Sequence, residues 1–206
     1  MVSTPRPLSA EPATGGAVSS PTQAASLSAR FSAYLIDSVV LLGFILAFFA
    51  IAGLVLLVSS DLGAEDPPDL AYYAFMGIFI GGTVIAWSAF NLALALWHGQ
   101  SAGQYIAGLR VVSEDTGRVT ARRRLLRWFA LHPLLFHPLM ISIWAPFAAI
   151  AVSLTLSQLV LALTLGLVAL CIVSPVAAVV AAVVDGERRA LHDRVAGTMV
   201  VPAGRR

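Results

Sequence analysis

Lysine is absent from this sequence, so all 13 basic residues are arginine, and charged residues of both signs make up only 12% of the chain. Soluble globular domains carry about 25% charged residues, which excludes an ordinary water-soluble surface. A single cysteine, Cys171, rules out an internal disulfide, and its apolar surroundings predict a buried, inert thiol. With 58% hydrophobic residues and a mean hydropathy of +0.85, the 206 residues predict an integral membrane protein of one domain.

Large apolar residues are also scarce in the first 28 residues, which are rich in Ser, Ala, Pro, Thr and Gly. Such a segment buries too little apolar surface to offset the entropy lost on ordering. We therefore expect residues 1–28 to form a disordered cytoplasmic tail. No basic segment leads into a short apolar run there, so a signal peptide is not predicted.

Long apolar runs fill most of the remaining chain. About 20 apolar residues cross a hydrocarbon core, and the first run, from Val39 to Val58, has that length without one charge. The last run, from Trp128 to Val184, would form a helix of about 85 Å and must therefore fold back on itself near Pro146. We predict an all-α membrane domain over residues 29–201, followed by a tail of residues 202–206. The expected spans are residues 31–58, 71–97, 128–150 and 157–184.

Arginines mark one side of these spans. Every arginine lies before residue 31, between residues 98 and 127, or after residue 184, whereas the acidic loop 59–70 and the turn near residue 154 contain none. By the positive-inside rule, we expect four transmembrane helices with both termini in the cytoplasm.

The segment between the second and third spans, residues 98–127, should form a short β-hairpin-like cytoplasmic loop, because "LRVV" and "RVT" flank the turn "SEDTG". Arginines at its end should contact anionic lipid headgroups, at about 1 kcal/mol each. These residues are Arg122, Arg123, Arg124 and Arg127. Little aromatic surface is interleaved with them, so no nucleic-acid partner is expected.

A G-x-x-x-G step, Gly77 and Gly81, lies inside the second span. Two interpretations remain open: a close helix–helix contact, within the chain or with a larger membrane complex, or a pair of glycines simply tolerated in lipid.

Within the predicted spans, no Asp, Glu, Arg or His lies in the outer half, and those present are at the cytoplasmic ends. A proton or cation carrier usually places such groups near the membrane midplane, so this pattern argues against a monomeric carrier. His132 and His137, in "HPLLFHP", are five residues apart and do not share a helix face as a metal pair would. The sequence also shows no catalytic grouping or phosphate-binding loop. We expect no enzyme activity, no metal and no cofactor.

Three stretches in this order, "ARFSAYLID", "GQSAGQYIAGLRVVSEDTGRVTARRRLLR" and "RRALHDRVAGTMVV", resemble the three blocks of the RDD family. These are small multi-spanning bacterial membrane proteins named for one arginine and two aspartates. The resemblance implies a location in the bacterial cytoplasmic (inner) membrane. It also implies a role in transport, including the sodium/proton exchange suggested for some members.

The family's charged residues correspond to Arg30, Asp37 and Asp193, although the nearby Asp185 is an alternative for the second aspartate. Other matching motif positions are Gly103, Gly108, Arg110, His192, Gly197 and Thr198. The sequence departs from the family at Ser101, where threonine is common, and at Gln104, where lysine is common. A role that needs a cation at Gln104 is therefore not expected here.

Arg30 and Asp37 are seven residues apart on one helix face, about 10 Å along the axis, which is too far for an easy direct pair. We expect Asp193 to pair with Arg30 and an arginine of the middle loop, such as Arg110, to face Asp37. Two functions fit this cluster: transport of an ion or small solute by an oligomer, or a non-enzymatic accessory role in a larger membrane complex.

Overall fold

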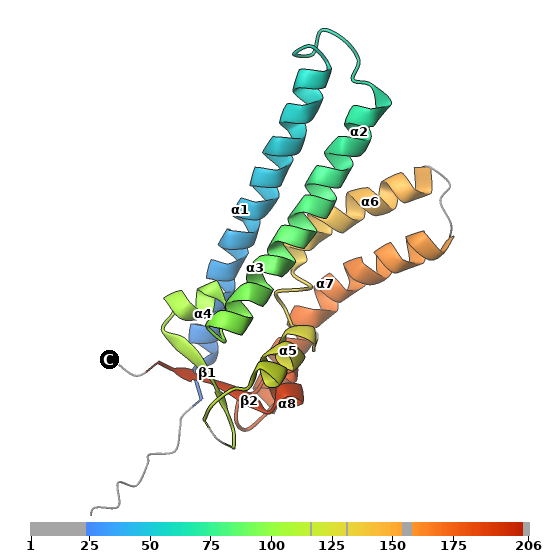
Figure 1. Cartoon of the computed structure of the whole chain (residues 1–206). Coiled ribbons are helices and arrows are strands. Elements are labelled where there is room, and N and C mark those ends of the chain that lie inside the picture. Colours follow the sequence, from blue (N-terminus) through green and yellow to red (C-terminus); the bar gives the residue numbers. More distant parts are fainter. Residues whose placement is uncertain (1–23, 116, 131, 154–157, 204–206) are drawn as a thin grey trace, which may run out of the picture.

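The computed structural model describes residues 24–115, 117–130, 132–153 and 158–203. Three of its helices are long and apolar enough to cross a membrane: Leu27–Ser59, Asp69–Trp97 and Gln158–Val184. Figure 1 shows them leaving one end of the molecule, where the short helices and the two strands gather. The protein is therefore a helical, multi-pass membrane protein whose short helices α4, α5 and α8 and both strands collect at one end.

The first helix, α1 (Leu27–Ser59), begins before the expected residue 31. The Ser26 side chain accepts a hydrogen bond from the Ala29 N–H and so caps the helix. Ala25 is fully buried, and its N–H donates to the Val200 carbonyl at 2.8 Å. The expected tail of residues 1–28 is thus wrong at its end, and residues 1–23 lie outside the described residues.

The second crossing is one continuous helical run built from α2 (Asp69–Met76), the π-helical segment η1 (Gly77–Gly82) and α3 (Thr83–Trp97). Nothing lies within 4 Å of a Cβ placed on Gly77 or Gly81. A close helix–helix contact at these two glycines within the chain is therefore wrong. The close approach is made instead by Gly82, where a Cβ would lie 2.6 Å from the Phe48 ring.

The predicted third span, residues 128–150, is wrong in its first part. The amphipathic helix α5 (Ala121–Phe129) ends there, and helical structure resumes only at η2 (Pro138–Met140) and α6 (Ile141–Ser153). The reason is local: Pro133 and Pro138 disfavour the helical conformation of the histidine before each. The 13 residues of α6 rise about 20 Å, short of a full hydrocarbon core.

The last long helix, α7 (Gln158–Val184), agrees with the expected span 157–184. It returns beside α6 and leads into the short helix α8 (Leu191–Ala196). In Figure 1 the α6–α7 pair diverges from α1 and the α2–α3 run. Where the two pairs do meet, Leu41, Trp87, Ile143 and Cys171 belong to one buried apolar cluster, so the cysteine is buried as predicted.

The expected hairpin in the middle loop is also wrong. Strand β1 (Leu109–Ser113) forms as predicted, but it pairs antiparallel with β2 (Thr198–Pro202) from the far end of the chain. Ala25, Leu109 and Val200 pack together in a small core beneath this sheet. The expected second strand, "RVT", would not bring Val200 into this core. This explains why β1 pairs with the C-terminal strand β2 instead. The motif helix α4 (Ala102–Ile106) precedes β1.

Candidate functional site

A buried carboxylate, Asp193 on α8, joins two arginines from distant parts of the chain. Arg30 Nη1 of α1 lies 3.2 Å from its Oδ2, and Arg127 Nε of α5 lies 2.9 Å from its Oδ1. The Asp193 side chain is fully buried, while Arg30 and Arg127 are only 14% and 8% exposed. The pair predicted between Arg30 and Asp193 is therefore confirmed, and Arg127 is a further partner. We call Arg30, Arg127 and Asp193 the charge cluster.

Backbone groups hold Asp193 in place. The Ala190 N–H donates to its Oδ2 at 3.3 Å, which satisfies a free donor at the start of α8. At the other end of α8, Gly197 adopts φ +61, a left-handed conformation that suits glycine at a helix C-terminus. Thr198 then places its buried hydroxyl 3.5 Å from the Asp193 carbonyl oxygen, to which it donates. Two of the predicted motif residues, Gly197 and Thr198, thus shape the turn behind the aspartate.

The second buried carboxylate, Asp37, is 3% exposed and has different partners from those predicted. The Ser101 hydroxyl donates to its Oδ2 and the Gly103 N–H donates to its Oδ1, each at 2.7 Å. A Cβ on Gly103 would lie 1.9 Å from the Ala33 carbonyl oxygen. Only glycine lets α4 approach α1 closely enough for this contact.

Arg110 does not face Asp37, so that predicted pair is wrong. Its side chain is exposed on β1, opposite Val201. Strand alternation explains the error, because Leu109 takes the inward-facing position and Arg110 must then point outward. Gly108 precedes the strand, with φ +64, and is not among the described hydrogen-bond partners of either carboxylate.

The alternative aspartate, Asp185, is not part of the charge cluster. It lies 3.1 Å from Arg189 Nε and 3.1 Å from Arg194 Nη2. The hydrogen bonds from Arg189 hold the pKa of this carboxyl below its usual value, and those same contacts raise the pKa of Arg189. Of the two aspartates, it is Asp193 that pairs with Arg30 in the described part of the chain.

The four arginines of α5 point in different directions. Arg127 is buried against Asp193, so its predicted contact with lipid headgroups is wrong. Arg123 lies 2.5 Å from Asp115 and also donates to Ser113, and Arg124 donates to the Leu96 carbonyl. Arg122 is exposed. The sequence analysis treated the four arginines as one group because all of them precede the hydrophobic run after residue 128. On a helix, however, residues three and four apart share a face and adjacent residues do not, so the four side chains cannot all have the same surroundings.

Two histidines lie beside the charge cluster. The His132 and His192 ring centroids are 4.3 Å apart, and His192 Nε2 is 3.7 Å from Asp193 Oδ1. Burial, assisted by the cations of Arg127 and Arg30, holds the pKa of His192 well below its ordinary value, so this ring is neutral at pH 7. Across the described ranges, no group of three or more His, Cys, Asp or Glu side chains is arranged to hold a metal ion.

The departures from the family pattern have a structural explanation. Ser101 caps α4: its hydroxyl accepts from the Gln104 N–H at 3.2 Å, while the Gln104 side chain accepts from the Ser101 N–H at 3.2 Å. Serine supplies the same hydroxyl that threonine would supply. The uncharged Gln104 closes a capping box and needs no cation for it.

Comparison with known proteins gives one family. The model of the RDD family matches residues 24–197, which contain the first two blocks, the third block as far as Gly197, and most of the chain. No curated protein and no solved structure matches the chain.

Proposed function

The chain belongs to the RDD family, and from that premise and the charge cluster we propose that it forms an oligomeric unit that transports an ion or small solute. In this proposal the charge cluster holds two helical hairpins together at the cytoplasmic face of a bacterial inner membrane. No catalytic chemistry is assigned to it.

The position of Asp193 is the observation that carries this proposal. Its carboxylate binds Arg30 near the start of α1 and Arg127 near the end of α5, which is the helix that precedes η2 and α6 in the chain. One hairpin, α1 with the α2–α3 run, is thereby tied to the other, α6 with α7. Because the hairpins diverge away from this junction (Figure 1), a change in the cluster would alter the angle between them.

The membrane orientation belongs to the proposal as well. In the described part of the chain, the arginines lie in the first turn of α1, between α3 and η2, or after α7. These segments gather at the cluster end of the molecule (Figure 1), which supports a cytoplasmic location for that end. The exposed Arg122 is left as the arginine best placed to meet anionic headgroups. The short α6, preceded by η2, would form the third of four crossings.

An oligomer is proposed because three deep polar side chains donate to backbone carbonyls of their own helical run. Thr83 donates to the Phe79 carbonyl, Asn91 to the Trp87 carbonyl and Thr164 to the Val160 carbonyl, each four residues earlier. Such side chains do not line a polar path through one copy. A solute path would then run between copies.

An accessory role in a larger membrane complex is the second candidate. It is favoured by the apolar outer face of α7, where five valines are more than half exposed in the single chain: Val173, Val176, Val179, Val180 and Val183. Such a face packs equally well against lipid or against another membrane protein.

The test combines purification with flux. The tagged full chain, expressed at its native level, is solubilised in mild detergent; its mass and co-purifying proteins are measured. The same protein is then placed in liposomes, where sodium-dependent proton movement is followed with a pH-sensitive dye. Asp37→Asn removes a buried carboxylate, and Asp66→Asn, in the loop at the opposite end, is the matched control.

A homo-oligomer whose flux is lost in D37N and kept in D66N supports transport. A stoichiometric complex with another membrane protein, without flux by the chain alone, supports the accessory role. Equal flux in D37N and the wild type would overturn the link between the buried carboxylates and transport.

A further inference from the structure

The amphipathic helix α5 has one exposed stripe, which we call its outer face. The stripe has the spacing i, i+3, i+4 and i+7 and consists of Arg122, Leu125, Leu126 and Phe129. Its three apolar side chains are 36%, 41% and 67% exposed in the single chain. Apolar surface of this extent gains free energy when another apolar surface covers it.

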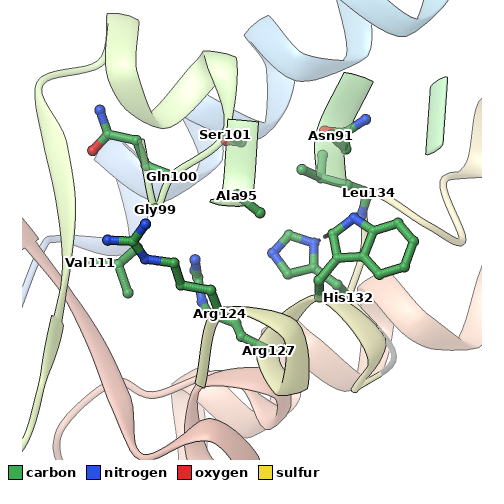
Figure 2. Close-up of a pocket in the computed structure, with 11 residues that line it drawn as sticks. Asn91, Ala95, Gly99, Gln100, Ser101, Val111, Arg124, Arg127, His132 and Leu134 are labelled. Atoms are coloured by element: carbon green, nitrogen blue, oxygen red, sulfur yellow. Dashed lines mark hydrogen bonds between the residues drawn. The ribbon is translucent and has the colours of Figure 1, made fainter. Parts of the chain in front are cut away.

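The other sides of α5 are fixed to the protein. Arg127 is buried against Asp193, and Arg124 donates to the Leu96 carbonyl near the end of α3. Figure 2 shows the Arg124 side chain reaching from α5 toward the turn at Gly99. These contacts hold α5 in one rotation, with the outer face turned away from them.

The contact with Leu96 also sets the depth of α5 relative to the membrane helices. Leu96 is the next-to-last residue of α3, where the second crossing ends, and the last residue, Trp97, is 78% exposed. Exposed aromatic side chains at the end of a crossing are typical of the membrane–water interface. Because Arg124 joins α5 to this point, the outer face is at the level where headgroups and acyl chains meet.

The charge of α5 favours one kind of lipid. The helix carries four arginines and no acidic residue. Arg123 and Arg127 pair with carboxylates, whereas Arg122 and Arg124 form no ion pair among the described residues. Positive charge therefore remains beside an apolar stripe, and this combination favours a membrane surface with negative headgroups.

We propose that the outer face of α5 is a docking surface for anionic phospholipids, with its three apolar side chains among the acyl chains and Arg122 at a headgroup phosphate. This rests on the membrane placement proposed above, and it extends the headgroup contact of Arg122 to a whole lipid-binding face. Because Arg127 binds Asp193 from the same helix, lipid docked here holds α5 against the charge cluster. The tests involve no flux, so failure of this proposal is distinguishable from failure of the transport proposal.

The first experiment measures where the outer face lies. Cys171→Ala removes the native thiol, and Leu126→Cys or Phe129→Cys then carries a nitroxide label. Arg110→Cys is the control, because Arg110 is exposed on β1. In vesicles of phosphatidylcholine and phosphatidylglycerol, labels at positions 126 and 129 should collide mainly with oxygen, which concentrates in the membrane. The label at position 110 should collide mainly with a water-soluble nickel chelate.

The second experiment measures lipid selectivity. Binding of phosphatidylglycerol and of phosphatidylcholine to the full chain in mild detergent is counted by native mass spectrometry. Arg122→Gln should weaken phosphatidylglycerol binding about fivefold, which corresponds to about 1 kcal/mol for one arginine at an anionic surface. Arg110→Gln is the matched control, because Arg110 is exposed and forms no ion pair within the described ranges. R110Q should stay within about twofold of the wild type.

Two results of the labelling experiment overturn the proposal. Labels at both outer-face positions that collide mainly with the nickel chelate place this face in water. Labels shielded from both probes show that protein, such as a second copy of the chain, covers the face in place of lipid.

Two results of the binding experiment also overturn it. Phosphatidylglycerol bound no more tightly than phosphatidylcholine excludes recognition of the negative headgroup. Equal losses in R122Q and R110Q exclude a specific role for Arg122. Two label positions and a separate charge variant keep the test decisive if one variant does not fold.

Discussion

Removing the charge of Asp193 is the perturbation whose result the structure defines best. Asp193→Asn keeps the size of the side chain but leaves Arg30 and Arg127 without a carboxylate. Both arginines are largely buried, at 14% and 8% exposure, so water does not replace the lost partner. The expected effect is therefore that of an uncompensated buried charge, not that of a surface pair.

The size of the effect follows from these contacts. Breaking a buried ion pair by removing one partner costs about 3–5 kcal/mol, and D193N should lower the free energy of unfolding by that amount. In double-mutant cycles with Arg30→Gln and Arg127→Gln, the coupling with Arg127 should be the larger. Its contact is shorter, 2.9 Å against 3.2 Å, and less exposed.

The assay is equilibrium unfolding of the purified protein in mixed detergent micelles, followed by far-ultraviolet circular dichroism. Asp115→Asn is the matched control, because Asp115 also pairs with an arginine, Arg123, but is 66% exposed. That change should cost less than about 1 kcal/mol. A loss in D193N no greater than in D115N, or zero coupling in both cycles, would refute the assignment of the charge cluster as the junction of the two hairpins.

Three further predictions concern the rest of the site. Gly103→Ala should prevent accumulation of folded protein, measured by expression and gel filtration, because its Cβ would overlap a backbone carbonyl of α1; Gly108→Ala meets open space and should cost only about 1–2 kcal/mol of backbone strain. Ser101→Ala should lower the free energy of unfolding by about 1.5–3 kcal/mol by removing a hydrogen bond to the Asp37 carboxylate, whereas S101T should retain wild-type stability. Because folding lowers the pKa of His192, the unfolded chain binds a proton that the folded chain does not. The free energy of unfolding should therefore fall as the pH drops below about 6.5, by up to about 1.4 kcal/mol per pH unit. Melting curves from pH 7.5 to 5 should show a smaller dependence of stability on pH in H192Q, and an identical dependence would contradict the lowered pKa of His192.

The long helices were predictable because they depend on composition along a continuous segment. The runs 71–97 and 157–184 were found almost to the residue, since an apolar stretch of membrane length has few alternatives to a helix. The third span failed because the two His-Pro pairs interrupt the helix within an equally apolar stretch. Hydropathy does not register that backbone effect.

The contacts within the site were likewise predicted only in part. Arg30 and Asp193 were paired correctly from the order of the family blocks, but Arg127 was assigned to lipid and Arg110 to Asp37. Both errors concern which way a side chain points, and that depends on how an element is rotated against its neighbours. The pairing of β1 with β2 is of the same kind, because the strands are separated by most of the C-terminal half.

By itself the sequence determined a low-charge, apolar, multi-pass helical protein and its family, and it predicted Arg30, Asp37 and Asp193 as the charged residues of that family's pattern. These follow from local composition and from ordered motifs, which are properties of the chain before it folds. Only the tertiary structure decided that Asp193 joins Arg30 to Arg127, and that a backbone N–H and a hydroxyl donate to Asp37. Such contacts form between residues far apart in the chain, so their physical cause is packing, which no local pattern contains.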